Sequence, residues 1–313
     1  MEGKTRTREL HEDNTINGRD IGGPAALEVR NLIKIYKTGK IEVVALNGVS
    51  FTLDPGTIAV IMGPSGCGKT TLLNMIGGLD VPDAGKVLIN GKDILELKGT
   101  KLDNFRRNNI GFVFQFLNLI PTLNAEENIK ACLVHANLSN RKEKAWIDEL
   151  FEMVGMSARR HHMPDEMSGG EQQRVAIACA LANKPLVLLA DEPTGELDSK
   201  NKREIMALFT KLVEEDPSKI VIIVTHDPSF QEIADSVLFI RDGKIIYKGK
   251  GIGETAGSDG NVDKRMPDDT GQEVEVLSRE MVQLSREAEK LREEMDKFRE
   301  VKELLKQINK VFD

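Results

Sequence analysis

The chain has 313 residues, of which 40% are hydrophobic and 30% are charged, a composition typical of a soluble globular protein with one strongly charged part. Its formal net charge of −7 gives no overall attraction to nucleic acid or to anionic lipid. The apolar runs, such as LVLLA and IVIIV, are too short to span a bilayer, so we expect any membrane role to depend on a partner chain. The 3 cysteines lie far apart without a CxxC pattern, which argues against a disulfide framework or a zinc site and favours a reducing, cytosolic compartment.

The predicted elements begin after a polar N-terminal segment. Residues 1–26 carry charges of both signs and no apolar run, so we predict a disordered tail there and no signal peptide. Residues with β-branched side chains then predict strands over 27–37 and 41–56. A short buried strand over 57–62, a glycine-rich loop and a helix that begins at Lys69 are predicted next.

The middle of the chain combines helices with further apolar strands. From about 116 to 168 the pattern is mostly helical, and we assign this range to a helical subdomain. Strands return at 186–191 and 220–226, with a helix around 202–215 between them. Strands that alternate with helices and are uniformly apolar indicate a parallel sheet covered on both faces. The predicted fold class is therefore α/β, with one domain over 27–250.

The C-terminal part differs from this domain in composition. Residues 251–274 are rich in Gly and Asp, which predicts a flexible linker. Over 275–313, apolar residues recur at alternating spacings of four and three from Leu277 to Phe298, which predicts a coiled coil with a register break near Phe298. A charged, exposed single helix remains the alternative for this segment.

A phosphate-binding loop is predicted between the strand at 57–62 and the helix after it. The segment GPSGCGKT fits the pattern G-x-x-x-x-G-K-[ST] in that context, which an ordinary glycine turn does not explain. Glycines leave backbone N–H groups free for phosphate oxygens, and the helix N-terminus adds partial positive charge. We expect Lys69 to reach the β- and γ-phosphates and the Thr70 hydroxyl to bind Mg²⁺. The nucleotide-binding residues predicted here are Gly63, Pro64, Ser65, Gly66, Cys67, Gly68, Lys69, Thr70 and Thr71.

A pair of carboxylates follows another apolar strand, in the segment LVLLADEPT. Asp191 ends that strand and is predicted to hold Mg²⁺ through its water shell. Glu192 points elsewhere and is predicted to polarise an attacking water. The alternative is an acidic pair that merely solvates a strand end, but its combination with a phosphate-binding loop favours the catalytic interpretation.

The stretch MSGGEQQR (167–174) is polar and rich in glycine, and it leads into a sequence that favours a helix. It resembles the signature motif of the ATP-binding subunits of ABC transporters, and the resemblance extends over about 27–250. Tyr36 resembles the aromatic residue that stacks on adenine in that family, Gln115 the glutamine that joins the sheet to the helical subdomain, and His226 the switch histidine. Several long stretches look closest to the branch of lipoprotein-release and macrolide-export ATPases.

The resemblance implies a P-loop NTPase core of the ABC type, with an antiparallel β subdomain and a helical subdomain, followed by the coiled-coil helix. It implies an ATPase, with ATP and Mg²⁺ as cofactors, that couples head-to-tail dimerisation to a membrane permease of the mechanotransmission type. The cargo class would be lipoprotein, lipid or peptide, moved by export or extrusion. The expected partners are that integral-membrane permease and a second copy of the chain, and the expected location is the cytoplasmic face of the membrane.

The resemblance also gives roles to single residues. Glu192 is expected to be the general base and His226 to contact the γ-phosphate, while Gln115 joins Thr70 and Asp191 at the metal and water site.

The signature of one copy is expected to cap the ATP that the other copy holds. The nucleotide-binding residues implied there are Ser168, Gly169, Gly170 and Glu171. The same four residues predict a capping box on local grounds, with Ser168 as the N-cap and Glu171 at the third helical position. The two interpretations do not compete.

Two positions depart from the family pattern, and one loop is unusually apolar. Cys179 stands where the family usually has arginine, and Glu196 stands where a small or amide residue is common.

The segment FVFQFLNLIPTL is unusually apolar for a loop, so we expect it both to pack the helical subdomain and to form a groove for a short helix of the membrane subunit. The residues expected to be most exposed there are Phe116, Leu117 and Leu119.

The alternative function is that of a soluble ABC ATPase that acts on nucleic acid or ribosomes. In the DNA-repair type the coiled coil interrupts the ATPase, whereas here it follows the whole domain, and the translation-factor type has two ATPase domains in one chain. Residues 277–313 contain 9 Lys or Arg and 9 Asp or Glu, so the coil has no basic surplus for a phosphate backbone. We therefore predict no nucleic-acid partner, and we expect the coil to mediate self-association or docking.

Overall fold

The structure is a computed structural model, and it describes residues 15–16, 19–20, 26–39, 41–133, 140–195 and 197–251. Within the range 1–26 it describes two short strands, β1 (Thr15–Ile16) and β2 (Arg19–Asp20), which pair antiparallel. The predicted linker beyond Gly251 and the predicted coiled coil over 275–313 lie outside the described residues.

The central sheet has six strands in the order β12-β11-β5-β10-β9-β8. All neighbouring pairs in it are parallel except β11 and β12. Every residue of β9 and β10 is buried, as their apolar sequences predict for central strands of a parallel sheet. The strands are β5 (Thr57–Met62), β8 (Ile110–Val113), β9 (Val187–Asp191), β10 (Ile220–Val224), β11 (Ser236–Arg241) and β12 (Lys244–Gly249).

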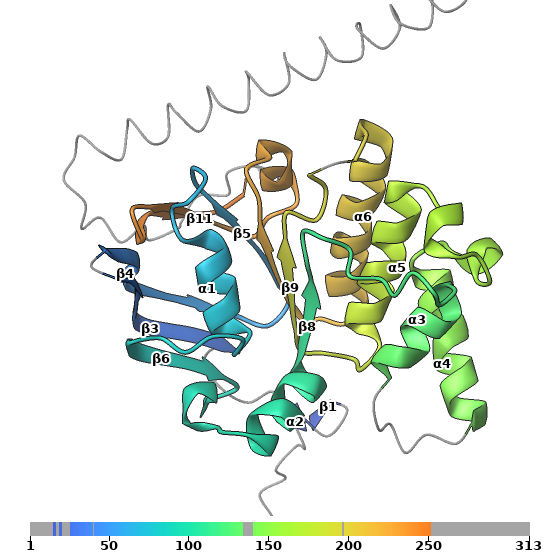
Figure 1. The fold of residues 1–313 in the computed structure, drawn as a ribbon, viewed down its shortest axis with the longest axis horizontal. Coiled ribbons are helices and arrows are strands. Elements are labelled where there is room, and N and C mark those ends of the chain that lie inside the picture. Colours follow the sequence, from blue (N-terminus) through green and yellow to red (C-terminus); the bar gives the residue numbers. More distant parts are fainter. Residues whose placement is uncertain are drawn as a thin grey trace, which may run out of the picture.

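A second sheet has four antiparallel strands in the order β4-β3-β6-β7, which confirms the expected antiparallel β subdomain. Its strands are β3 (Leu27–Thr38), β4 (Ile41–Leu53), β6 (Ala84–Ile89) and β7 (Lys92–Asp93). The helix α1 (Lys69–Ile76) lies between this sheet and the central sheet (Figure 1). The helix that carries the end of the phosphate-binding loop is therefore held from two sides.

Two hydrophobic clusters cover the two faces of the central sheet. In β5, Ile58, Val60 and Met62 belong to one cluster, and Ala59 and Ile61 belong to the other, because alternate side chains of a strand point to opposite faces. The first cluster also contains side chains of the helices that follow β8 and β9, and the second contains those of α1 and the antiparallel sheet. The prediction of a parallel sheet buried on both faces is confirmed.

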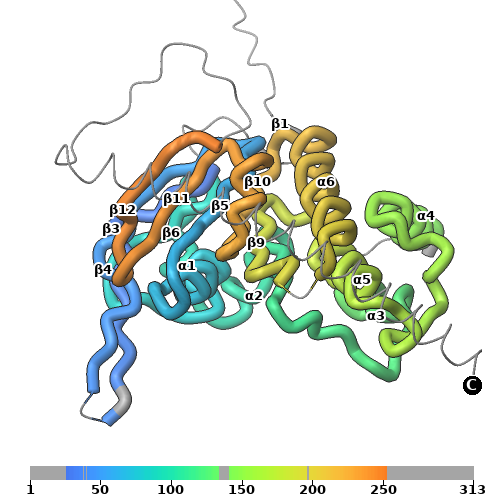
Figure 2. The backbone as a smooth tube through the Cα atoms, turned by 90° about the horizontal axis from the view of Figure 1, so that it is seen from above, coloured from blue at the N-terminus to red at the C-terminus, as the bar shows by residue number. Residues whose placement is uncertain are grey.

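The remaining helices gather mainly at one end of the molecule. Figure 2 shows α3, α4 and α5 grouped on the side away from the antiparallel sheet, which is the place of the predicted helical subdomain. The helices are α2 (Thr100–Asn109), α3 (Ala125–Cys132), α4 (Asn140–Met153), α5 (Gly169–Leu181) and α6 (Ser199–Glu215), with short 3₁₀ segments at η1 (Ile94–Glu96), η2 (Ser157–Arg159), η3 (Pro164–Glu166) and η4 (Pro228–Glu232).

Side-chain caps explain where two of these helices begin, and one of them, α6, begins earlier than its sequence pattern suggests. Helix α6 begins at Ser199 because the Asp198 carboxylate accepts hydrogen bonds from the backbone N–H groups of Lys200 and Asn201, both at 2.9 Å. Helix α5 begins at Gly169, as the predicted capping box with Ser168 as its N-cap requires, so the glycines of the signature lie in its first turn.

Candidate nucleotide-hydrolysis site

The phosphate-binding loop connects β5 to α1 and needs glycine at two positions. Gly63 has φ 151° and Gly68 has φ 106°, conformations that residues with a side chain rarely adopt. A Cβ atom on Gly63 would lie 2.1 Å from the Ile240 carbonyl oxygen, and one on Gly68 would lie 2.3 Å from that of Ala45. The loop is thus pressed against backbone of both sheets, and its shape is fixed by those contacts.

The Lys69 side chain folds back into this loop and is buried. Its Nζ atom donates hydrogen bonds to the carbonyl oxygens of Gly63 at 2.8 Å and Pro64 at 2.9 Å. An ammonium group has three N–H donors, so one remains for a phosphate oxygen. The arrangement places a positive charge at the mouth of the loop.

Asp191 ends β9 with a buried carboxylate that has one unpaired oxygen. Among the described residues, Oδ1 has no hydrogen-bond partner. Burial raises the pKa of this carboxyl above its usual value and the Glu192 charge adds to that, while the Thr70 hydroxyl and Lys69 act in the opposite direction. An unpaired carboxylate oxygen next to a hydroxyl is the donor set that Mg²⁺ prefers, so these residues fit that ion.

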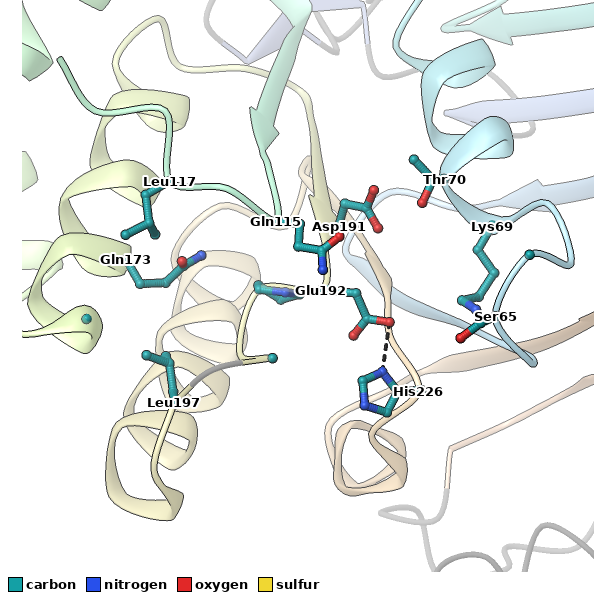
Figure 3. Close-up of a pocket in the computed structure, with 14 residues that line it drawn as sticks. Ser65, Lys69, Thr70, Gln115, Leu117, Gln173, Asp191, Glu192, Leu197 and His226 are labelled. Atoms are coloured by element: carbon teal, nitrogen blue, oxygen red, sulfur yellow. Dashed lines mark hydrogen bonds and ion pairs between the residues drawn. The ribbon is translucent and has the colours of Figure 1, made fainter.

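Glu192 lies next to Asp191 but is held by the neighbouring strand. Its backbone has φ 47°, an uncommon conformation for a residue with a side chain, and its N–H donates to the Val224 carbonyl oxygen at 2.8 Å. Its Oε2 accepts a hydrogen bond from the Thr225 hydroxyl at 3.0 Å, and its Oε1 lies 3.0 Å from His226 Nδ1. The turn therefore directs the Glu192 carboxylate away from Asp191 and toward the histidine (Figure 3).

These side chains surround one cavity of about 520 Å³. Figure 3 shows the loop residues on one side, the two carboxylates in the middle and residues of the helical subdomain on the other side. Gln115, on the segment after β8, points toward Asp191 and Glu192 in the middle of this view. The lining residues are Ser65, Gly66, Lys69, Thr70, Gln115, Leu117, Gly169, Gln173, Asp191, Glu192, Pro193, Gly195, Leu197 and His226.

Tyr36 lies outside this cavity, on β3, and is partly exposed. Its hydroxyl donates to Asp80 Oδ2 at 2.9 Å, and the Lys34 ammonium lies 4.9 Å from the centre of its ring. Burial and the hydrogen bond to Asp80 raise the pKa of Tyr36, while Thr71 lowers it. The contact with Thr71 places the ring beside the start of α1, on the same side as the phosphate-binding loop.

The signature forms the capping box that its sequence predicts. The Glu171 N–H donates to Ser168 Oγ at 3.3 Å, and the Ser168 N–H donates to Glu171 Oε2 at 2.8 Å. Ser168 and Gly169 are exposed, and a Cβ on Gly169 would meet only Leu197 Cδ2, at 3.7 Å. Of the four signature residues predicted to bind nucleotide, only Gly169 lines the cavity of its own chain.

Gly170 is buried and differs from Gly169 in what surrounds it. A Cβ atom there would lie 2.1 Å from Asn201 Oδ1, on α6. Gly170 is therefore required for the packing of α5 against α6. The Glu196 position, predicted as a departure close by, lies outside the described residues.

Sequence reasoning missed Gln173, which lines the cavity from the second turn of α5. It lies four residues after Gly169, so the two residues share one face of the helix. A polar residue in the face that a helix buries is the signal that could have identified it. Thr225, which holds Glu192, was missed as well.

A second cavity, of about 590 Å³, lies between the segment after β8 and the helical subdomain. Leu117 and Leu119 line it, whereas Phe116 does not and is 77% exposed. Cys179, the predicted departure, also lines it and contacts Cys132. The Cys179 thiol donates a hydrogen bond to the Cys132 sulfur, and this bond together with burial raises the pKa of Cys179 far above its usual value.

A phosphate-binding loop, a buried carboxylate beside its threonine and a second carboxylate facing the same cavity define a P-loop ATPase. The comparisons with known proteins identify the family. The ABC transporter family matches residues 46–195. The chain belongs to the ABC transporter family, in which it is an ATP-binding, ATP-hydrolysing subunit.

Two curated relatives and one solved structure show how far this similarity extends. An uncharacterised ABC transporter ATP-binding protein of Thermotoga maritima is 46% identical over 219 residues, which are 70% of this chain and 93% of that protein. The lipoprotein-releasing system ATP-binding protein LolD of Syntrophotalea carbinolica is 44% identical over 71% of this chain and 98% of its own. The dimeric post-hydrolysis structure of the ATP-binding cassette MJ0796, bound to ADP and Pi, matches with a TM-score of 0.67 and 40% identity, over 73% of this chain and 100% of that chain.

These similarities confirm the predicted α/β cassette fold of the ABC type and the resemblance to the lipoprotein-release branch, and they do not test the predicted coiled coil. They give no support to the alternative of an ATPase that acts on nucleic acid or ribosomes. Of the helices that the structure describes, none has the length and apolar character needed to cross a membrane.

Proposed function

We propose that this chain powers a membrane permease of the lipoprotein-release and macrolide-export type from the cytoplasmic face of the membrane, through ATP-driven dimerisation of two copies. The observation that carries the hydrolytic part is the convergence of Lys69, Asp191 and Glu192 on one cavity. The transporter branch is supported by the similarity to a lipoprotein-releasing ATPase subunit.

The chain's own residues bind and orient ATP. The backbone N–H groups of the loop and the Lys69 ammonium hold the β- and γ-phosphates, and the Tyr36 ring stacks on the adenine. Thr70, Asp191 and Gln115 would hold Mg²⁺, which would neutralise charge on the phosphate oxygens. The unpaired Asp191 Oδ1 supports this assignment.

Glu192 is the general base of the proposed mechanism. Its carboxylate accepts a proton from water as the water oxygen attacks the γ-phosphorus and the bond to the bridging oxygen breaks. The Thr225 hydroxyl and His226 fix the orientation of that carboxylate. His226 is 74% exposed, so its ring is accessible to a γ-phosphate in the cavity.

A second copy of the chain completes the site. The exposed Ser168 and Gly169 present the N-terminus of α5, where free N–H groups and the helix dipole attract an anion. In a head-to-tail pair they cap the γ-phosphate held by the partner copy. The dimeric form of the similar MJ0796 cassette supports this arrangement. The coiled coil predicted over 275–313 is proposed to add self-association.

The second cavity is proposed to receive a short helix of the permease. It combines apolar residues such as Leu117 and Leu119 with the cations Arg106 and Arg107. An amphipathic helix with an acidic end fits such a groove.

Isolation of the tagged chain from its own membranes tests the proposal. We expect an integral-membrane protein with a large extracytoplasmic domain to copurify and to raise the rate of ATP hydrolysis. Copurification of ribosomes or nucleic acid, with no membrane protein, would contradict the transport function and leave the hydrolytic site unaffected.

A further inference from the structure

Gln173 is a buried side chain with an unused hydrogen-bond donor. Only 4% of the residue is exposed, and its Nε2 atom has no hydrogen-bond partner among the described residues. A buried amide N–H without a partner costs folding free energy, so native structures rarely keep one without a reason.

Its neighbours on α5 are paired within the chain. Gln172 Nε2 donates to the Met167 carbonyl oxygen at 3.0 Å. Arg174 Nη1 donates to Asn201 at 3.1 Å and to Glu204 at 2.7 Å. The unused donor therefore belongs to Gln173 specifically and is not a general feature of this helix.

The side chain of Gln173 is directed into the ATP cavity. Figure 3 shows it extending from α5 toward Gln115, with Leu117 above it and Leu197 below it. Glu192, farther across the cavity, already accepts from Thr225 and pairs with His226. The Gln115 side chain makes no hydrogen bond to the described residues. Its side-chain oxygen is therefore available as an acceptor for the Gln173 amide.

We propose that Gln173 is a positioning residue for ATP hydrolysis, whose side-chain amide donates a hydrogen bond to the Gln115 side-chain oxygen when nucleotide fills the cavity. The proposal rests on the role of Gln115 at the metal and water site proposed above. A hydrogen bond made in the nucleotide-bound state stabilises that state and holds Gln115 against the reacting centre.

The position of Gln173 gives this hydrogen bond a second consequence. Gly169, one turn earlier on the same face of α5, belongs to the helix end that is proposed above to cap the ATP of the partner copy. A shift of α5 as that ATP binds moves Gln173 with it. The start of α5 thus affects two ATP sites. It contacts the phosphates held by the partner copy directly, and it acts on Gln115 of its own chain through Gln173.

The test is Gln173→Leu in the full-length chain, because leucine removes the amide and fills the buried space. We expect kcat for ATP hydrolysis to fall about tenfold, the loss of one hydrogen bond in the reacting state, while KM for ATP stays within about twofold. We expect the midpoint of thermal unfolding without nucleotide to stay equal or rise, because an unpaired buried donor has been removed. Gln173→Met is the second variant if leucine packs badly.

Gln172→Leu is the matched control on the next residue. It removes the hydrogen bond to Met167, so it should lower the unfolding midpoint without nucleotide. A midpoint that is equal or raised in Gln173→Leu but lowered in Gln172→Leu would confirm that only Gln172 has a partner within the chain.

A double variant separates action through Gln115 from a direct effect. If Gln173 acts through Gln115, then Gln173→Leu added to Gln115→Ala should lower kcat no further than Gln115→Ala alone. Independent, multiplying losses in the double variant, or a Gln173→Leu kcat within twofold of the parent, would overturn the proposal. If Gln115→Ala hydrolyses ATP at the parental rate while Glu192→Gln does not, the proposed hydrolytic site is supported and the proposed role of Gln173 is overturned. A parent chain that hydrolyses no ATP would overturn the proposed function itself.

Discussion

The carboxylate of Glu192 is paired with the ring of His226, with 3.0 Å between Oε1 and Nδ1. The Glu192 N–H also donates a hydrogen bond to the Val224 carbonyl oxygen. The end of β10 therefore positions both the Glu192 carboxylate and the His226 ring. The predicted base and the predicted switch residue therefore form one hydrogen-bonded unit.

Glu192→Gln is expected to lower kcat by about 10²- to 10⁴-fold, because the amide cannot accept the proton of the attacking water. Affinity for ATP should be unchanged, since Glu192 does not hold the phosphates. The variant should accumulate as an ATP-bound dimer, measured by light scattering with ATP and with ADP. Near-normal hydrolysis would rule out Glu192 as the base.

Two neighbouring glycines of the signature should respond differently to alanine. Gly170→Ala is expected to destabilise the fold by about 1–3 kcal/mol through overlap with Asn201. Gly169→Ala has room for its Cβ atom and should keep or raise stability, because alanine favours a helix by up to about 1 kcal/mol.

The Gly169 variant should bind ATP normally, but its ATP-dependent dimerisation and its rate of ATP hydrolysis should each fall at least about tenfold. The reason is that its methyl group blocks the approach of a phosphate. Thermal unfolding, nucleotide binding and sedimentation of the pair measure these effects. Equal destabilisation by both alanines would contradict the assignment of Gly170 to internal packing.

Asp191→Asn is expected to stabilise the chain without metal at neutral pH. Burial raises the pKa of Asp191 in the folded chain, so the folded state binds its proton more tightly than the unfolded state. Stability from this group is therefore greatest at low pH and is lost as pH rises from about 4 through the raised pKa.

Asparagine carries no charge, so the stability gained over the parent should be present at about pH 7 and vanish near pH 3. Mg²⁺ with ATP should raise the unfolding midpoint of the parent more than that of the variant. Calorimetry across this pH range, with and without Mg²⁺, measures both effects. A variant less stable than the parent at pH 7 without metal would show that the charge is compensated.

Phe116→Glu should leave the unfolding midpoint and ATP binding unchanged, because this side chain is 77% exposed and lies outside the ATP cavity. Copurification of the permease should fall, because Phe116 adjoins Leu117, which lines the second cavity, and a charge beside an apolar docking surface opposes docking. Undiminished copurification would place the permease contact elsewhere. Ile41→Glu, on an exposed part of β4, is the matched control.

The parts of the site that sequence could predict are those fixed by local rules. The loop from Gly63 to Thr70 follows from its motif between a buried strand and a helix. The capping box of Ser168 and Glu171 follows from residue types three positions apart. The central strands β9 and β10 were predicted because each is a short, continuous apolar run.

The parts that sequence could not predict depend on contacts between distant segments. The unpaired amide of Gln173 and the overlap that any side chain at Gly170 would make with Asn201 arise from how α5 packs, and no spacing rule encodes them. Short strands such as β7 and β8 were not placed either, since two to four residues carry too little periodic signal.

Asn201 joins the start of α6 to the start of α5. Its Nδ2 atom donates to Asp198 Oδ2 at 2.6 Å, and its Oδ1 atom accepts from Arg174 at 3.1 Å while lying over Gly170. A displacement of the loop before α6 is therefore passed directly to the signature through one side chain. Genetic suppressors of damage at one of these two segments should accordingly be found in the other.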